Sequence, residues 1–338
     1  MKVLHLLASP VFSGPAETAT QLAIVQRVLG HEVTVAIDRK RTTVTSEELA
    51  TPRLEALGLL DGHGLELSAK SSPVGMLRDI RRLRTLEIDV LHCHFSHDHS
   101  LVRLGRPRGA RVIRSIHAPR SLRWSTPKAD GWTVPVDGWA RRLLGAPVMV
   151  LPPLVDATFV QPVDRLERKR ALGLGEGPVV GMVSAFQPSR RHDVGLAAFT
   201  LLHARRPDAS LVLVGDGAEE GAIRAEIAAR QLGDCVRLAG YQSGARFVEH
   251  LQAMDEVWVL GLGNDHAGRA AAQARACGAR VVAVDEGALA KFADLVVPCE
   301  SVAIAEVALQ ESRRSVTIET PLAIAGRLME LYARATVP

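Results

Sequence analysis

The chain has 338 residues, of which 47% are hydrophobic and 4% aromatic, and its formal net charge is +4. This length suits two medium-sized domains, and the composition excludes a disordered or low-complexity protein. Cores built from Ala, Val, Leu and Ile rather than from aromatic rings are typical of buried parallel strands covered by helices.

Short β-rich runs alternate with helical patterns through the first half of the chain. Strands are predicted at 3–7, 33–37, 90–95, 112–117, 132–135 and 148–151. Between the first two strands, Leu22, Val25 and Leu29 recur at helical spacing and predict a helix over 17–29, which Gly30 ends. This alternation implies parallel strands joined by right-handed crossovers.

The same alternation starts again after residues 152–178, where two prolines, a charged stretch and three glycines follow one another. Strands are predicted at 179–186, 211–214, 236–239, 257–260, 281–284 and 295–297, and helices at 221–231 and 321–335. We therefore expect an α/β protein with two Rossmann-like doubly wound domains facing a cleft. Their expected bounds are 1–155 for the N-terminal Rossmann-like domain, 156–176 for a linker, 177–320 for the C-terminal Rossmann-like domain and 321–338 for a terminal helix.

The cysteines and the N-terminal segment indicate which cellular compartment to expect for the protein. The cysteines are widely separated and form no Cys-x-x-Cys pair: Cys93, Cys235, Cys277 and Cys299. A reduced, cytoplasmic protein is the simplest interpretation. The first apolar run is interrupted by His5, which favours a β-strand over a signal peptide. No apolar run approaches the ~20 residues that a membrane-spanning helix needs.

Positive charge is concentrated in the first half. Residues 1–150 carry 21 Lys+Arg and 14 Asp+Glu, and residues 101–150 alone carry 10 basic and 2 acidic side chains. Such a surface attracts an acidic acceptor, anionic lipid or nucleic acid, or is simply solvated. No recognition motif accompanies the arginines, so nucleic acid is not an expected partner. A peripheral contact with the inner face of a membrane stays open.

Histidines gather at the end of the strand predicted at 90–95. Four of them lie within eight positions: His92, His94, His97 and His99. Alternation places His92 and His94 on one face, which would suit a metal ion, but the other ligands would have to come from a flexible loop. We therefore expect polar residues facing a cleft, and no metal. His117 ends the next strand, where a histidine either polarises a substrate hydroxyl or is a satisfied structural residue.

Several turns could bind phosphate or an acceptor. Gly14 opens a strand–helix turn, and the Ala267-Gly268-Arg269 turn opens a helix, so backbone amides could receive phosphate at both. Arg190 could clamp phosphate from a polar loop, or is exposed without a ligand. The loop after His117 offers Arg120, Arg123 and Trp124 to an acceptor or a membrane, or binds nothing.

The order and spacing of these motifs resemble the retaining glycosyltransferases of family 4, which have the GT-B fold. Gly14-Pro15-Ala16-Glu17 resembles their Gly-Gly-Ala-Glu loop, and residues 89–94 resemble their Asp-Val-Val-His-x-His segment. Residues 213–217 resemble their Val-Gly-Asp-Gly turn. Asp265 and Gln273 stand where the family has two glutamates eight positions apart. Ala185 and Arg190 stand where it commonly has arginine and lysine.

The resemblance implies transfer of a sugar from a nucleotide-sugar donor to a glycan, lipid or small-molecule acceptor, such as a cell-envelope glycan or glycolipid. It implies no metal and no other cofactor. It assigns catalysis to His117 and Asp265. Donor binding is assigned to Gly14, Arg190, Gly215, Tyr241, Ala267, Gly268, Arg269 and Gln273, and acceptor binding to Arg120, Arg123 and Trp124.

Two other function classes are compared with this interpretation. A non-catalytic sugar-nucleotide or glycan-binding protein of the same fold is favoured by the departures at Ala185 and Gln273. A nicotinamide-dependent oxidoreductase would need a Gly-x-Gly-x-x-Gly turn after the first strand, and the chain lacks one there.

Overall fold

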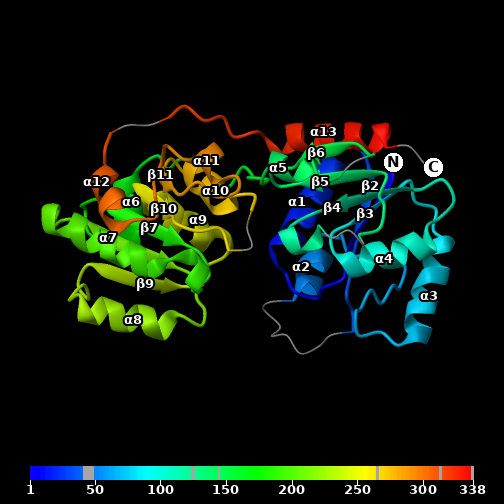
Figure 1. The fold of residues 1–338 in the computed structure, drawn as a ribbon, viewed down its shortest axis with the longest axis horizontal. Helices are drawn as coiled ribbons and strands as arrows, with labels where there is room; N and C mark the ends of the chain where they lie inside the picture. The colour runs from blue at the N-terminus through cyan, green and yellow to red at the C-terminus, as the bar shows by residue number, and fades with distance from the viewer. Residues whose placement is uncertain (41–48, 123–125, 144, 264–265, 312–313, 336–338) are drawn as a thin grey trace. The chain divides into compact units, whose positions relative to one another are not determined.

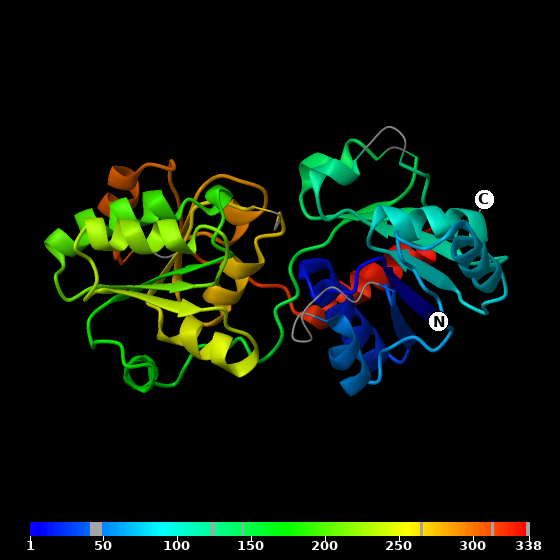
Figure 2. The same ribbon diagram turned by 90° about the horizontal axis from the view of Figure 1, so that it is seen from below.

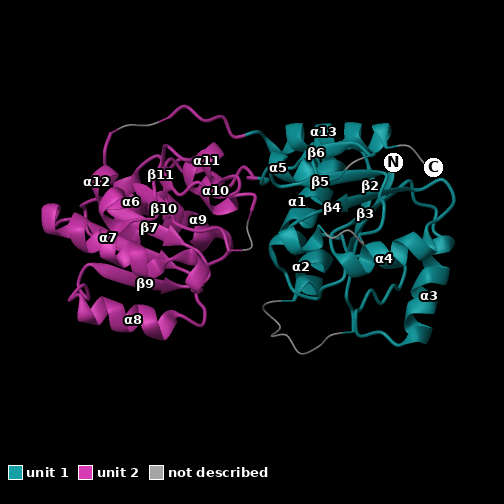
Figure 3. Ribbon diagram, in the orientation of Figure 1, with its two compact units in different colours: residues 1–154, 319–338 teal, residues 155–318 magenta. Residues whose placement is uncertain are grey.

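A computed structural model gives the fold, and it describes residues 1–338 except 41–48, 123–125, 144, 264–265, 312–313 and 336–338. The chain forms two compact units (Figure 3): unit 1 contains residues 1–154 and 319–338, and unit 2 contains residues 155–318. Residues 156–176, where the sequence predicts a linker, belong to unit 2 and contain helix α6 (Arg165–Ala171). The terminal helix belongs to unit 1.

Unit 1 is built on a six-stranded parallel sheet of order β2-β1-β3-β4-β5-β6 (Figure 1). Its strands are β1 (Lys2–Leu7), β2 (Glu32–Ile37), β3 (Val90–Cys93), β4 (Arg111–Ser115), β5 (Gly131–Val134) and β6 (Val148–Val150). Its helices are α1 (Gly14–Val28), α2 (Ala50–Ala56), α3 (Pro73–Arg84), α4 (Ser96–Gly105), the 3-10 helix η2 (Pro119–Ser121), α5 (Asp137–Ala140) and α13 (Pro321–Arg334).

Helices cover both faces of the unit 1 sheet (Figure 2). Successive side chains of a strand point to opposite faces. Val3 and Val90 therefore face α1 and α13, where they join a core that includes Leu328. Leu4 and Leu91 face α3 and α4 in a second core. Because both faces are buried, these strands are almost continuously apolar in the sequence.

Unit 2 repeats this plan with a six-stranded parallel sheet of order β12-β11-β10-β7-β8-β9. Its strands are β7 (Val179–Val183), β8 (Ser210–Val214), β9 (Val236–Gly240), β10 (Glu256–Val259), β11 (Arg280–Ala283) and β12 (Leu295–Val296). After α6, its helices are η3 (Pro188–Arg190), α7 (His192–Arg205), α8 (Glu220–Ala229), α9 (Gly244–Ala253), α10 (Arg269–Ala276), α11 (Leu289–Phe292) and α12 (Ser301–Val307).

Close packing on β7 explains two glycines of unit 2. Met182 packs against Gly195 of α7, where an added Cβ would lie 3.0 Å from the methionine Cε. On the other face, an added Cβ on Gly181 would collide with Met254, which follows α9. Helices therefore lie against both faces of this sheet as well, and the expectation of two doubly wound α/β domains is confirmed.

All twelve predicted strands are present, and they differ from prediction only at their ends. The strand predicted at 90–95 stops at Cys93, because Asp98 accepts hydrogen bonds from the Phe95 amide and opens α4. The strand predicted at 179–186 stops at Val183. No helix within the described residues is both long and apolar enough to cross a bilayer.

Candidate active site

The carboxyl end of the unit 1 sheet brings together side chains that are far apart in the sequence. Gly14 is the first residue of α1, and Pro15 follows in the first turn, which removes one backbone donor there. His94 and His117 follow β3 and β4, and their rings stack with centroids 5.4 Å apart. A hydrogen bond of 3.1 Å joins His94 Nδ1 and His117 Nε2.

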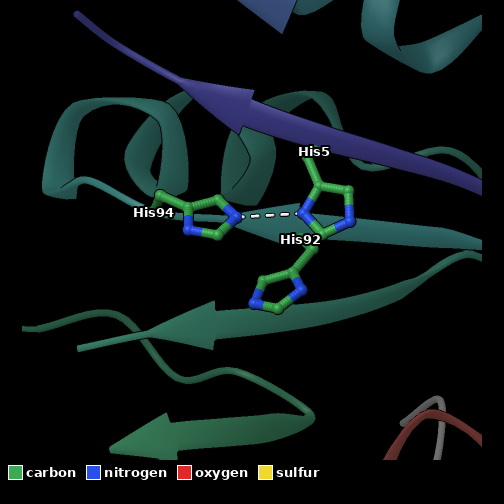
Figure 4. A group of neighbouring side chains, drawn as sticks. All are labelled: His5, His92 and His94. Atoms are coloured by element: carbon green, nitrogen blue, oxygen red, sulfur yellow. Dashed lines mark hydrogen bonds between the residues drawn. The ribbon is translucent and has the colours of Figure 1, made fainter. Parts of the chain in front are cut away.

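A third and a fourth histidine join this pair from neighbouring strands. The register of β1 and β3 pairs His5 with His92, and their ring centroids are 4.8 Å apart. His5 Nδ1 lies 3.0 Å from His94 Nε2, and Figure 4 draws this hydrogen bond as a dashed line. Burial lowers the pKa of His5 to about 4, and it lowers the pKa values of His92 and His94 well below 6.5. These rings are therefore neutral at neutral pH.

His5, His92 and His94 lie close enough together to be considered as metal ligands, with one nitrogen from each within 4.8 Å of the others. Their lone pairs do not converge, because the rings of His92 and His94 are stacked at an interplanar angle of 17°. Both ring nitrogens of His92 are occupied by hydrogen bonds, to Tyr332 at 2.6 Å and to Ser115 at 2.7 Å. These contacts favour a polar network over a metal site.

The remaining histidines of the 92–99 run lie elsewhere. His97 and His99 are on helix α4 rather than in a flexible loop, so the sequence interpretation of that segment is wrong. The ring of His99 meets Trp132 edge-on at 5.9 Å, on the opposite face of the sheet from His5. They are not further ligands for the cluster of His5, His92 and His94.

Part of the basic charge in residues 101–150 lies inside unit 1. Arg106 pairs with Asp130 at 2.6 Å, Arg111 donates to a backbone carbonyl near the end of α13, and Arg114 is 1% exposed. These three guanidinium groups therefore do not form a continuous basic surface. Arg120 is exposed in η2, whereas Arg123 and Trp124 lie outside the described residues.

In unit 2, Arg190 lies against the loop that follows β10. Its Nη1 donates to the Gly261 carbonyl at 2.9 Å. Gly263 has a φ of +53°, and an added Cβ there would lie 2.7 Å from Arg190 Nε. Only glycine allows the guanidinium to lie this close to the backbone. The same loop leads along the chain to the Ala267 turn, so Arg190 contacts a segment that is about 70 residues away in the sequence.

Helix α10 begins at this turn. Gly268 is its N-cap residue and has a φ of +73°. The first hydrogen bond of the helix runs from the Ala272 amide to the Gly268 carbonyl, so the amides of Arg269 and the next two residues come before it. Such a helix start favours an anion. Gln273 lies one turn further along and is 3% exposed. Asp265 lies outside the described residues.

Gly215 and Tyr241 have different surroundings. Gly215 has a φ of +147°, and an added Cβ would collide with the Ser184 carbonyl oxygen, so this glycine lets the turn after β8 pack on the loop after β7. Ala185, where the family resemblance leads one to look for arginine, is exposed in that loop. Tyr241 follows β9 and is 64% exposed.

Sequence reasoning missed three residues at this end of the unit 2 sheet. Arg191 has a φ of +57° and forms an ion pair with Glu286 at 2.5 Å. The other Glu286 oxygen accepts a hydrogen bond from the Leu262 amide at 3.3 Å. The Arg191–Glu286 ion pair is therefore bonded to the loop after β10. His192 is 4% exposed, and burial and the neighbouring Arg190 lower its pKa to about 4. Arg191 and His192 adjoin Arg190 in the sequence, whereas nothing in the sequence marks Glu286.

Two family models match the chain. "Glycosyl transferase 4-like domain" matches residues 13–175, and "Glycosyl transferases group 1" matches residues 164–295. D-inositol 3-phosphate glycosyltransferases from Jonesia denitrificans and Actinosynnema mirum are 31% identical over 194 residues and 36% identical over 154 residues. These regions are 50% and 43% of the chain but 46% and 37% of the relatives, so less than half of each relative is matched.

Solved structures share the whole fold at low identity. Anabaena Alr3699/HepE in complex with UDP has a TM-score of 0.73 and 16% identity, covering 99% of this chain and 95% of that one. Sucrose-phosphate synthase from Thermosynechococcus elongatus has a TM-score of 0.65 and 16% identity, with the same coverage. At this identity the likeness concerns the fold alone, and it confirms the expected GT-B-like architecture.

Proposed function

The chain belongs to the group 1 glycosyltransferases, and on that premise we propose that it transfers a sugar from a nucleotide-sugar donor to an acceptor. The observation that carries the proposal is the position of Arg190 on the loop that leads to the start of α10. There the Arg190 guanidinium and the backbone amides at the start of α10 would neutralise a diphosphate leaving group. A protein of the same fold has been crystallised with UDP and glucose.

The donor is proposed to bind unit 2 through Arg190, Ala267, Gly268 and Arg269. Arg190→Ala should weaken binding of a nucleoside diphosphate by roughly 1.5–3 kcal/mol, the range for a hydrogen bond to a charged group. Calorimetry with UDP, GDP and ADP measures this. Arg206→Ala is the matched control, since Arg206 lies in the same unit and forms an exposed ion pair with Asp208. Unchanged affinity of the Arg190 variant for every nucleotide would remove this donor site.

A non-catalytic binding protein of the same fold remains the second candidate, favoured by Ala185 and Gln273. Gln273→Glu should preserve or improve donor affinity, because a carboxylate makes stronger hydrogen bonds to ribose hydroxyls than an amide does. Product analysis should be run on the natural chain and on Ala185→Arg combined with Gln273→Glu. Transfer by the natural chain supports the enzyme, whereas transfer by the double variant alone indicates a decayed transferase. Binding without turnover in both would reject the enzyme.

The acceptor, the stereochemistry and the metal requirement are parts of the same proposal. The curated relatives are named for D-inositol 3-phosphate, so an inositol phosphate is the first acceptor to assay. We propose retention of the anomeric configuration, which NMR of the product would establish. We also propose metal-independent transfer, so activity should survive EDTA treatment.

A further inference from the structure

We propose that His5 and His94 are positioning residues that hold His117 in one tautomer, with the proton on Nε2, and that Gln26 sets the direction of their hydrogen bonds. A use of this arrangement in sugar transfer rests on the proposed function, but the tautomer itself does not. The three histidines form one hydrogen-bonded row that runs from helix α1 to the end of β4.

The row starts at Gln26 of α1, whose side-chain amide is fixed on both sides. Its Nε2 lies 3.1 Å from the Tyr332 hydroxyl and 3.6 Å from the Met329 sulfur. A thioether sulfur accepts hydrogen bonds and cannot donate them, so the NH2 group must face Met329. Gln26 Oε1 therefore faces His5 Nε2, 2.9 Å away, and that carbonyl oxygen can only accept.

This orientation determines the proton on each ring in turn. A neutral imidazole has one donor and one acceptor nitrogen. His5 must donate from Nε2 to Gln26, so its Nδ1 accepts from His94 Nε2 at 3.0 Å. His94 Nδ1 is then the acceptor for His117 Nε2 at 3.1 Å. His117 is left with a lone pair on Nδ1, and within the described residues no protein group donates to that atom.

A second branch of hydrogen bonds starts at the side-chain NH2 group of Gln26, and their donor and acceptor roles are also determined. Since the Tyr332 hydroxyl accepts from Gln26, it donates to His92 Nδ1, 2.6 Å away. His92 then donates from Nε2 to Ser115, and Ser115 donates to Thr133 at 2.6 Å. This branch ends inside the sheet, and it gives a matched control because it shares Gln26 but does not reach His117.

The chemical consequence concerns what His117 can do. With its lone pair on Nδ1, the ring accepts a hydrogen bond from a hydroxyl group and cannot donate one from that atom. A substrate hydroxyl is thus the kind of group it would hold, rather than a carboxylate or phosphate oxygen. Reversing the row would place the bare His5 Nε2 against the Gln26 carbonyl oxygen, leaving two buried acceptors facing each other.

NMR of the full chain labelled with 15N-histidine tests the proposal, because long-range proton–nitrogen spectra distinguish the two neutral tautomers. At pH 7.5 we expect His5, His94 and His117 to carry the proton on Nε2, favoured by about tenfold or more. His203 and His250 are internal references with the proton on Nδ1, since each donates from that atom to a backbone carbonyl. A His117→Asn variant assigns the His117 signals.

Variants of the two branches complete the test. Gln26→Leu should abolish the Nε2 preference of His117, whereas Tyr332→Phe should alter His92 and leave His117 unchanged. A His117 ring protonated on Nδ1, or charged, in the natural chain would overturn the proposal whether or not the variants fold. So would one equivalent of Zn2+ shifting the His5 and His94 ring signals, because a metal would occupy the lone pairs of the row. Absence of sugar transfer would reject the proposed function and leave the tautomer result standing.

Discussion

Burial keeps His5, His92 and His94 of unit 1 neutral by lowering their pKa values, and this makes stability depend on pH. The pKa of His5 falls from 6.5 to about 4, because its ring is fully buried. Between these values the unfolded chain binds the proton and the folded chain does not. The free energy of unfolding should therefore decrease from pH 7 to pH 5, by about 2 kcal/mol for His5 alone. Urea unfolding at the two pH values measures this.

The same residue provides the control. His5→Gln removes the titrating ring, so the difference in unfolding free energy between pH 7 and pH 5 should shrink by about the same 2 kcal/mol. The groups that face His5 are His92, His94 and Gln26, of which the two histidines also stay neutral in the fold. An equal pH dependence in the variant and the natural chain would mean that His5 is protonated when folded.

At the scale of single residues, the sequence predicted correctly those side-chain positions that depend only on the alternation of side chains along a strand. It placed His92 and His94 on one strand face, as the stacked rings confirm. It could not find His5 or Gln26, because their approach depends on strand register and on a helix crossing. Glu286 escaped for the same reason, since its partner Arg191 is 95 residues away.

At the scale of the elements, helix α13 packs its apolar face into the core of unit 1. Leu328 is 0% exposed and Leu322, on the same helix, is 50% exposed. Leu328→Ala should lower the free energy of unfolding of unit 1 by about 2–5 kcal/mol, because it removes buried methyl groups and leaves a cavity. Leu322→Ala is the matched control, with an expected change within about 0.5 kcal/mol. Calorimetry that finds equal effects would show that α13 does not pack as described.

At this scale the sequence predicted the strands well and their ends less well. Strand interiors are marked by apolar β-branched runs, whereas their ends depend on which group takes the next backbone hydrogen bond. Phe186 illustrates this. Its amide donates a hydrogen bond of 2.6 Å to the Asp216 carbonyl, in the turn after β8, and Phe186 is not part of strand β7. The segment 156–176 looked like a linker because one proline and two glycines flank a helix of only seven residues, α6.

The whole molecule has a separate core in each unit, so a ligand that binds one unit should protect that unit. A nucleoside diphosphate at 100 times its dissociation constant should stabilise unit 2 by about 2.7 kcal/mol and leave unit 1 unchanged. Scanning calorimetry with and without UDP resolves the two transitions. The Leu328→Ala variant identifies the unit 1 transition. A shift confined to the unit 1 transition would show that the nucleotide binds unit 1, contrary to the prediction.

The return of α13 to unit 1 has a consequence for biosynthesis. Unit 2 is encoded entirely between the two segments that make up unit 1. A ribosome that adds about 5–20 residues per second needs on the order of 10–30 s to translate residues 155–318. During that interval the apolar face of the first sheet lacks Leu328 and Tyr332, which cover it in the finished protein. The segment translated first therefore completes its core only after all of unit 2 has been translated.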